Sequence, residues 1–275
     1  MAKTILITGT SSGIGNASAR VFAANGWNVI ATARSPDAIG EIDGANVAKL
    51  RLDVTDPASI ADAIEAGIER FGGIDVVLNN AGYGLYGVFE SLSDDDIRAM
   101  FETNLFGVMN VVRAILPHFR ARRAGSIVTI SSGGGVFALP AMALYCSSKF
   151  AVEGYSEGIY HELGALGISV KLIEPGGVAS TPFDASALAR MEGAKPPVEY
   201  RPFLEGLARN MVAMRDAVQS TADDVAQAVY AATTDGTTRL RYVVTDDIKE
   251  LIRLRREVSE DAYMGFVKAY IAPSV

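Results

Sequence analysis

Residues 4–15 read TILITGTSSGIG, a short apolar run followed directly by a turn rich in glycine. Gly9 can adopt a tight turn, Gly13 lets the backbone approach a phosphate group, and Gly15 allows close packing of a helix on a strand. Ile14 opens an amphipathic pattern, and the amide groups at a helix N-terminus attract an anion. The glycine spacing differs from G-x-G-x-x-G, so a turn that binds nothing is the alternative. The stretch predicts a strand, a phosphate-binding turn and a helix.

The same alternation of short β-type runs and longer helical patterns continues along the chain. Runs rich in Val, Ile and Leu are typical of strands buried on both faces of a parallel sheet. Asp56 before Pro57, and Ser93 before three aspartates, are signals for helix starts. We therefore expect an α/β fold: a single-domain, Rossmann-type, doubly wound parallel sheet of about seven strands with helices on both faces. The expected strands are residues 4–8, 28–32, 47–52, 74–79, 126–131, 168–173 and 239–244, and the expected helices are residues 14–25, 57–71, 94–122, 144–166 and 221–233.

The domain organisation follows from the length of the chain and from one irregular segment. The 275 residues suffice for one large domain, and no stretch has the composition of a linker, so residues 1–275 are expected to form a single domain. Residues 179–220 break the alternation and contain several prolines. Because a connection of that length in a compact domain is usually functional, we expect an insertion that contributes to substrate binding.

The composition disfavours several classes of partner. A formal charge of −7 and a pI near 5.0 leave no basic face for nucleic acid. Cys146 is the only cysteine, so an intramolecular disulfide is impossible and a reducing compartment fits best. The two histidines, His118 and His161, cannot by themselves form a zinc site, and we expect no metal. With no room for a charged leader and no run of ~18 apolar residues, the sequence predicts a cytoplasmic protein that does not span a membrane.

Further motifs follow the glycine turn in a fixed order, after expected strands or on expected helices. They are Asn79-Asn80-Ala81-Gly82, Asn104, Ser132, Tyr145-x-x-x-Lys149 and Pro175-Gly176. In order and spacing these motifs resemble those of the classical short-chain dehydrogenase/reductase (SDR) family, over about residues 4–180. The resemblance implies a nicotinamide cofactor, oxidoreductase chemistry and a homodimer or homotetramer. Apolar residues on more than one face of the expected helices 94–122 and 144–166 also favour a partner subunit.

The end of the second expected strand bears on the choice of cofactor. A carboxylate there accepts hydrogen bonds from the adenosine ribose and repels a 2′-phosphate. This chain has Ala33 at that position, and the adjacent Arg34 could pair with a phosphate. NADP is therefore favoured over NAD; the alternatives are that Arg34 is an ordinary loop residue or that Asp37 folds back on it. The cofactor contacts expected from the motifs and the resemblance are Gly9, Ser11, Ser12, Gly13, Ile14, Gly15, Arg34, Asp53, Val54, Asn80, Ala81, Gly82, Tyr145, Lys149, Pro175, Gly176, Val178 and Ser180.

Tyr145 and Lys149 stand four residues apart at the start of an expected helix, so both side chains project from one face. The ammonium should lower the pKa of the phenol, which is about 10 in model peptides. Ser132, after the preceding strand, could hydrogen-bond a substrate carbonyl together with Tyr145. The resemblance implies that Tyr145 is the general acid and base, that Lys149 also holds the nicotinamide ribose, and that Asn104 supports a water relay to the lysine. Taken alone, the pair could be a helix-surface pair without function, and Cys146 is expected to be a small buried side chain.

The segments expected to reach a substrate are mostly apolar. They are residues 83–88, residues 133–143 and the 179–220 insertion with Phe183, Met191, Tyr200, Phe203, Leu204 and Met211. Because these segments carry no cluster of Arg or Lys, they favour an apolar ketone or secondary alcohol over a carboxylate or phosphate. We expect an NADP(H)-dependent enzyme that interconverts carbonyl compounds and alcohols. The alternatives are an NADP(H)-binding sensor or scaffold without turnover, and an SDR-type epimerase or dehydratase.

Overall fold

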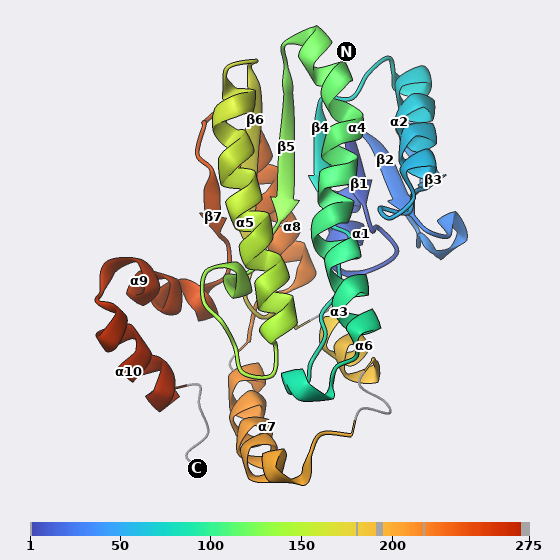
Figure 1. Cartoon of the computed structure of the whole chain (residues 1–275). Helices are drawn as coiled ribbons and strands as arrows, with labels where there is room; N and C mark the ends of the chain where they lie inside the picture. The colour runs from blue at the N-terminus through green and yellow to red at the C-terminus, as the bar shows by residue number, and fades with distance from the viewer. Residues whose placement is uncertain (1, 180, 191–194, 217, 271–275) are drawn as a thin grey trace.

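The computed structural model describes residues 2–179, 181–190, 195–216 and 218–270. Within these residues, seven parallel strands form one sheet in the order β3-β2-β1-β4-β5-β6-β7 (Figure 1). The strands are β1 Thr4–Thr8, β2 Asn28–Ala33, β3 Val47–Arg51, β4 Val76–Asn79, β5 Gly125–Ile130, β6 Ile168–Glu174 and β7 Arg241–Val243. The predicted doubly wound parallel sheet is confirmed, although β4 begins later and β7 is shorter than the sequence indicated.

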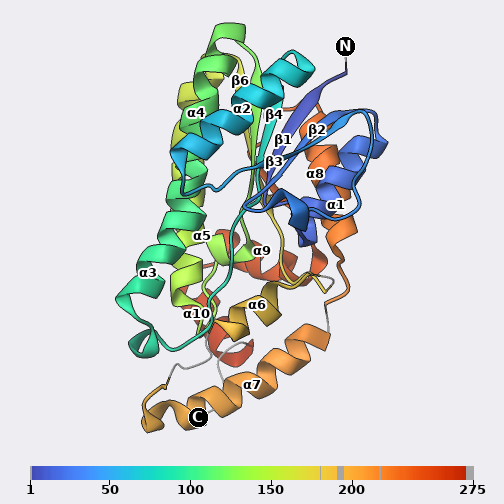
Figure 2. The same cartoon turned by 90° about the vertical axis from the view of Figure 1, so that its right-hand side faces the viewer.

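Helices cover both faces of this sheet, as Figures 1 and 2 show. One face carries α1 Gly13–Ala24 and α8 Ala222–Thr234; the other carries α2 Pro57–Phe71, α4 Gly107–Arg122 and α5 Ala143–Gly164. Alternate residues of β1 point into the two cores, because side chains of a strand alternate between its faces. Ile5 and Ile7 pack with Phe22 of α1. Leu6 packs on the opposite side with Ile60 of α2.

The helix expected over residues 94–122 is interrupted by a π-helical turn. The run consists of α3 Asp94–Phe101, the π segment η3 Glu102–Phe106 and α4. Such turns are frequent at functional sites, and this one contains the buried Asn104. Among the described residues, Asp94–Arg122 is the one helical run that could cross a membrane by length and composition. A core helix passes the same test, and Val111 and Ile115 of this run pack in the core against the sheet.

Further helices lie beyond the carboxyl ends of the strands (Figures 1 and 2). They are α6 Phe183–Ala189, α7 Arg201–Asp216, α9 Lys249–Glu257 and α10 Glu260–Tyr270. The insertion expected to be irregular is therefore largely helical where it is described. Its prolines suggested a break in helical structure, but two of them lie at helix starts. Pro182 is the N-cap of α6 and Pro202 lies in the first turn of α7, where a missing amide proton is tolerated. The short 3₁₀ helices are η1 Pro36–Ala38, η2 Phe89–Ser91, η4 Gly133–Gly135, η5 Val198–Tyr200 and η6 Asp246–Ile248.

Candidate active site

The predicted site residues meet at the carboxyl edge of the sheet. The glycine turn follows β1, Asn80 follows β4, Ser132 follows β5 and Pro175 follows β6, while Tyr145 lies in the first turn of α5. The chain fills the sheet outward from β1 in both directions, so β1 and β4 flank the point where the strand order reverses. Ligands of open α/β sheets bind at this edge, at that point.

The glycine turn is fixed by its backbone conformation and by close contacts. Gly9 and Gly13 have φ angles of 72° and 57°, in the left-handed region that favours glycine. A Cβ atom on Gly9 would lie 2.9 Å from Cα of Ala81, and one on Gly15 would overlap the carbonyl oxygen of Gly9. A side chain at Gly9 would therefore push against the loop after β4, and one at Gly15 would push α1 away from the turn.

Asn80 ties the turn after β4 to the glycine turn. Its side-chain amide donates to the carbonyl oxygens of Thr8 and Gly9 at 2.8 and 2.9 Å. Oγ1 of Thr8 accepts from the backbone amides of Asn80 and Ala81 at 3.0 Å each. Gly82 follows, where a Cβ atom would lie 3.1 Å from Oδ1 of Asn104. The Asn80 side chain thus holds the backbone that is expected to approach a cofactor.

The N-terminus of α1 is open to an anion. Its N-cap residue, Ser12, makes no side-chain capping hydrogen bond, and no acidic residue stands in the first turn. In contrast, Asp56, Ser93 and Thr221 cap α2, α3 and α8 with their side chains. The first amide groups of a helix have no partners within the helix, so those of α1 can donate to a phosphate. Ser11 and Ser12 are exposed beside them, and the turn fits the pyrophosphate of a dinucleotide.

Arg34 lies where the adenosine ribose of a dinucleotide is expected. It follows β2 and is exposed, whereas Ala33 is buried at the end of that strand. Asp37 is exposed in η1, and no hydrogen bond or ion pair joins it to Arg34 in the described structure. The geometry therefore gives no support to the alternative in which Asp37 neutralises the arginine.

Asp53 follows β3 and shapes its own turn. Its Oδ1 accepts hydrogen bonds from the backbone amide and the hydroxyl of Thr55, at 2.9 and 2.8 Å. Val54, the next predicted contact, is buried in the core that α2 and α4 form with the sheet. Only the backbone around Val54 and the exposed side of Asp53 are thus placed to meet an adenine.

Ser132, Tyr145 and Lys149 lie together, with Tyr145 and Lys149 buried and Ser132 half-buried. Tyr145 is 7% exposed and its hydroxyl hydrogen-bonds the Ser132 side chain. Oγ of Ser132 also accepts from the backbone amide of Gly134 at 3.0 Å. Nζ of Lys149 donates to the carbonyl oxygen of Ile130 at 2.8 Å and lies 5.8 Å from the centre of the Tyr145 ring. The structure brings these three predicted residues together.

Burial decides the protonation of this group. Burial raises the pKa of Tyr145 to about 12, although the hydrogen bond with Ser132 acts in the opposite direction. The net shift is therefore opposite to the lowered pKa that the sequence predicted, because burying a phenolate is costly. Burial also lowers the pKa of Lys149 to about 8, and the charge of Glu153 acts against that shift. At neutral pH the site therefore holds a protonated phenol beside an ammonium group.

Asn104 connects the loop after β4 to α5. Its Nδ2 donates to the carbonyl oxygen of Tyr83 at 2.9 Å, and the Tyr83 amide donates to its Oδ1 at 3.1 Å. Nδ2 also donates to Oγ of Ser148 at 3.2 Å, and the Ser148 hydroxyl donates to the carbonyl oxygen of Tyr145 at 2.7 Å. No direct bond joins Asn104 to Lys149 in the described residues, so the water relay between them stays a prediction.

Helix α6 lies over Tyr145. The rings of Phe183 and Tyr145 meet edge to face, and the Tyr86 hydroxyl donates to Oδ1 of Asp184 at 2.7 Å. The guanidinium of Arg190 lies 4.0 Å from the ring centre of Tyr83. The sequence predicted that residues 83–88 and Phe183 face a substrate, but it did not predict these pairings, because no local pattern relates residues in distant segments of the chain. The apolar cluster under α6 consists of Tyr86, Met142, Tyr145, Cys146 and Ala187, with Leu139 and Phe183 at its edge.

Cys146 is the small buried side chain that the sequence predicted. Burial raises the pKa of its thiol, which disfavours the nucleophilic thiolate. The structure also contains no group of three or more His, Cys, Asp or Glu side chains suited to a metal ion within the described residues.

The segment after β6 is tied to η6. The amide of Gly176 donates to Oγ1 of Thr245, and that of Gly177 donates to Oδ2 of Asp247, both at 2.8 Å. The carbonyl oxygen of Pro175 accepts from the Gly133 amide at 2.8 Å. Val178 packs against α1 and α8. Of the other residues expected near cofactor or substrate, Tyr200 hydrogen-bonds Glu90 of η2, whereas Ser180, Met191 and the Met211 side chain lie outside the described structure.

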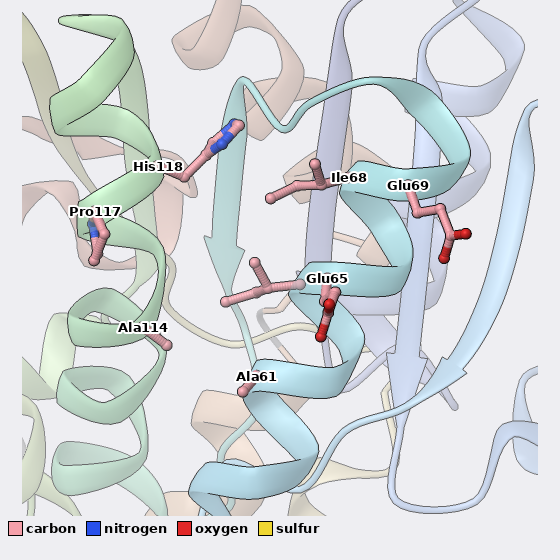
Figure 3. A pocket seen from close by; sticks show the side chains of 8 residues that line it. Ala61, Glu65, Ile68, Glu69, Ala114, Pro117 and His118 are labelled. Carbon is pink, nitrogen blue, oxygen red and sulfur yellow. The ribbon is translucent and has the colours of Figure 1, made fainter.

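An open groove of about 640 Å³ lies elsewhere, between α2 and α4 (Figure 3). His118 stands at one end, where its Nε2 lies 3.1 Å from the Ile74 amide and burial lowers its pKa. The groove does not reach the carboxyl edge of the sheet. Its lining is Ala61, Ile64, Glu65, Ile68, Glu69, Ala114, Pro117 and His118.

Known proteins resemble this chain in sequence. A family model described as short chain dehydrogenase matches residues 3–192. An oxidoreductase from Schizosaccharomyces pombe is 40% identical over 210 residues, which are 74% of this chain and 70% of the relative. A 3-ketodihydrosphingosine reductase from Bacteroides thetaiotaomicron is 41% identical over 175 residues, which are 62% of each protein.

Solved structures resemble it in fold. A short-chain dehydrogenase/reductase from Burkholderia phymatum, in complex with NAD, is 27% identical with a TM-score of 0.80 and covers 100% of this chain and 97% of its own. An alcohol dehydrogenase from Thermococcus sibiricus, complexed with 5-hydroxy-NADP, is 26% identical with a TM-score of 0.71 and covers 89% and 97%. This chain belongs to the short-chain dehydrogenase/reductase family. It is an oxidoreductase of that family, and the complexes of its neighbours support a nicotinamide cofactor, NAD or NADP.

Proposed function

We propose that this protein is an NADP(H)-dependent reductase or dehydrogenase that interconverts an apolar ketone and a secondary alcohol, with Tyr145 as general acid and base. The observation that carries the proposal is the group of Tyr145, Ser132 and Lys149 at the same sheet edge as the open N-terminus of α1. A sensor or scaffold that only bound the cofactor would not need this set of proton-carrying groups.

The chemistry of this group follows from its protonation. When bound, the nicotinamide would supply or accept the hydride at the substrate carbon. In reduction, Tyr145 donates its proton from Oη to the substrate oxygen, and Oγ of Ser132 hydrogen-bonds the same oxygen. The Lys149 ammonium then stabilises the phenolate that remains. In oxidation the phenolate takes the proton back, and Asn104 is proposed to support a water-mediated path that returns protons to Lys149.

The choice of NADP rests on the residues after β2. Ala33 offers no carboxylate to the ribose, and the Arg34 guanidinium, which is exposed, would pair with a 2′-phosphate. The amides of residues 11–15 would hold the pyrophosphate at the N-terminus of α1. The remaining cofactor contacts are proposed from the turns after β3, β4 and β6 and from Lys149, which would also hold the nicotinamide ribose.

The substrate is proposed from the lining of the site. Tyr86, Met142, Phe183 and Ala187 surround Tyr145 with apolar surface, and no cationic group among them would attract a carboxylate or phosphate. The name of the similar 3-ketodihydrosphingosine reductase is consistent with a keto substrate. We further propose that the described parts of residues 179–220 act as a lid, because α6 lies directly on the catalytic tyrosine.

Assembly and location are also proposals. Phe106 of η3 and Phe150 of α5 are 45% and 42% exposed, and exposed aromatic rings on adjacent helical segments favour a partner subunit. A homodimer or homotetramer formed on this face would lose mass in light scattering when Phe150 is changed to Glu. A cytoplasmic location fits the single free cysteine and is tested by cell fractionation.

Turnover assays test the proposed function. The purified protein is supplied with NADPH or NADH and a panel of apolar ketones, and with NADP and the corresponding alcohols, while the absorbance of the reduced cofactor is followed. We expect ketone-dependent oxidation of NADPH that is lost in Tyr145→Phe. Tight NADPH binding without turnover in either direction, across a panel on which a known reductase is active, would favour the scaffold alternative.

A further inference from the structure

A cluster of buried charges lies behind the catalytic helix. Glu153 of α5 and Glu174 of β6 have side chains only 7% and 0% exposed. Nε of Arg241, from β7, donates to Oε2 of Glu153 at 2.8 Å and lies 3.6 Å from Oε1 of Glu174. Nη2 of Arg256, from α9, donates to Oε1 of Glu174 at 2.8 Å. Both arginines come from beyond residue 192, outside the part of the chain that the family model matches.

The cluster adjoins the candidate active site through its two buried glutamates. Glu153 follows Lys149 by one helical turn, so the two side chains lie on one face of α5. Glu174 is the last residue of β6. The residue before it, Ile173, accepts a hydrogen bond from the amide of Ser131, which precedes Ser132 in the chain. A Cβ atom on Gly135 would lie 2.9 Å from Cγ of Glu153, so the missing side chain makes room for this glutamate.

The hydrogen bonding of this cluster is incomplete. Oε1 of Glu153, Oε2 of Glu174 and Oγ of Ser131 are buried without a hydrogen-bond partner. A buried carboxylate in this condition is costly, so it interacts strongly with any cation nearby. Lys149 is such a cation, because it is buried and its ammonium donates to the Ile130 carbonyl.

The surrounding charges leave Glu153 only partly neutralised. Arg241 is shared, because its Nη2 donates to Oε2 of Glu157 at 2.5 Å while its Nε serves Glu153. Arg256 forms its ion pair with Glu174 and not with Glu153. Part of the negative charge of Glu153 is therefore left to act on Lys149.

We propose that Glu153 is a positioning residue for the reaction: held by Arg241, it keeps Lys149 in its charged form beside Tyr145. This inference rests on the proposed function of Tyr145 and Lys149. It also gives the C-terminal part of the chain a role in the chemistry, since β7 supplies the arginine that fixes the glutamate.

The expected effect is a change in pH dependence. Burial lowers the pKa of Lys149 to about 8 even though the charge of Glu153 opposes that shift. Glu153→Gln keeps the size of the side chain and removes the charge, so Lys149 should lose its proton at a lower pH. The alkaline limb of the kcat profile for ketone reduction should therefore move to lower pH by roughly one unit. An opposite charge at close range shifts a pKa by about one to three units, and we expect the lower end of this range.

Glu157→Gln is the matched control, because Glu157 bonds the same arginine one turn further along α5 but has a 57% exposed side chain. Because solvent screens an exposed carboxylate, Glu157→Gln should move the profile much less than Glu153→Gln does. Glu153→Asp keeps the charge but shortens the side chain, so it should give a smaller shift in the same direction, and it decides the question if Glu153→Gln does not fold. Melting curves report the folding of each variant.

A second readout does not depend on turnover. The ¹⁵Nζ signal of Lys149, assigned by its absence from Lys149→Met, can be titrated by NMR in wild type and in Glu153→Gln. A titration moved to lower pH supports the inference. If the wild type is active and both the kcat profile and the Lys149 titration are unchanged in a folded Glu153→Gln, Glu153 is only structural. If the wild type shows no turnover, the proposed function fails, while the NMR titration still tests the coupling.

Discussion

The ring of Phe183 lies against the ring of Tyr145, with centroids 5.3 Å apart and planes inclined by 66°. Phe183 opens α6, and this contact places the helix over the hydroxyl group that we assign to proton transfer. Because the same ring would occupy a Cβ position on Gly84, it is held between the loop after β4 and the catalytic helix. The apolar side of the site is therefore built partly from the insertion after β6.

Phe183→Ala should weaken binding of an apolar ketone. The change removes part of the apolar surface around Tyr145, and burial of a large side chain contributes about 1.5–3 kcal/mol. Since Phe183 is only partly buried, we expect KM to rise roughly tenfold, at the lower end of that range. Phe183→Leu, which keeps apolar bulk, should stay near wild type. Steady-state kinetics decide it, and an unchanged KM in Phe183→Ala would show that α6 does not line the substrate site.

Tyr86→Phe should loosen α6 without disturbing the core. It removes the hydroxyl that donates to Asp184 but leaves the ring in its apolar cluster. A hydrogen bond to a charged group contributes about 1.5–3 kcal/mol, so amide exchange over residues 183–190 should accelerate by roughly tenfold or more. Tyr83→Phe is the control, because it keeps the ring beneath Arg190. Equal exchange in both variants would mean that the hydroxyl of Tyr86 does not hold the helix.

Tyr145→Phe should abolish turnover and leave cofactor affinity nearly intact. The ring and its packing remain, but the proton donor is lost, and general acid catalysis contributes about a hundred- to ten-thousandfold. Lys149→Ala should reduce both the rate and the affinity, since the ammonium is assigned to the phenolate and to the ribose. Fluorescence titration of NADPH together with turnover separates these effects. A Tyr145→Phe variant with a near-normal rate would contradict the mechanism.

These residues also show which parts of the site the sequence could predict. Tyr145 and Lys149 are neighbours because of helical periodicity, and the glycine turn is recognisable because it follows an apolar strand. Both relations join residues that are close in the sequence, so a sequence pattern can predict them. The motifs follow β1, β4, β5 and β6, which are neighbours in the sheet. Because these strands are parallel, the residues after them could be placed at one edge from the sequence.

The remaining features depend on contacts between distant segments. The bond between Tyr86 and Asp184 joins residues 98 positions apart, and nothing in either local sequence indicates it. The π turn at Asn104 lies inside a continuous helical pattern, where the apolar periodicity gives no sign of it. The raised pKa of Tyr145 reflects burial, which the spacing to Lys149 does not reveal.

The stability of the fold should depend on Asp235 in a pH-dependent way. Nζ of the buried Lys171 donates to Oδ1 of Asp235 at 2.5 Å and to the Ala232 carbonyl oxygen at 2.6 Å. Burial alone would raise the pKa of Asp235, but hydrogen bonds from Lys171 and Tyr242 hold it well below its usual value. The folded state therefore binds this proton less readily than the unfolded state. The contribution of this ion pair to the free energy of unfolding is complete at neutral pH, and it is lost as the pH falls below about 4.

Asp235→Asn should accordingly lower the free energy of unfolding at pH 7 by about 1.5–3 kcal/mol, the contribution of a hydrogen bond to a charged group. The difference from wild type should shrink as the pH is lowered toward 3. Urea unfolding at several pH values measures it, with Asp223→Asn as a control at an exposed ion pair. A difference that does not change between pH 7 and pH 3 would contradict the linkage.

The choice between NADP and NAD depends on two adjacent positions, Ala33 and Arg34. If Arg34 pairs with the 2′-phosphate, Arg34→Ala should weaken NADPH much more than NADH, because NADH has no such phosphate. A charge-assisted contact contributes about 1.5–3 kcal/mol, which corresponds to roughly ten- to a hundredfold in relative affinity. Arg51, the exposed last residue of the neighbouring β3, is paired with Asp56 and provides a control as Arg51→Ala.

Changing Ala33 to Asp in the Arg34→Ala background should move the preference further toward NADH. The carboxylate would repel the 2′-phosphate and accept hydrogen bonds from the free ribose hydroxyl, so both changes act in the same direction. Fluorescence titration of NADH and NADPH with wild type, both single variants and the double variant at one salt concentration measures this. Equal weakening of the two cofactors by Arg34→Ala would mean that the arginine supports its loop and does not read the phosphate, and the assignment of NADP would lose its main support.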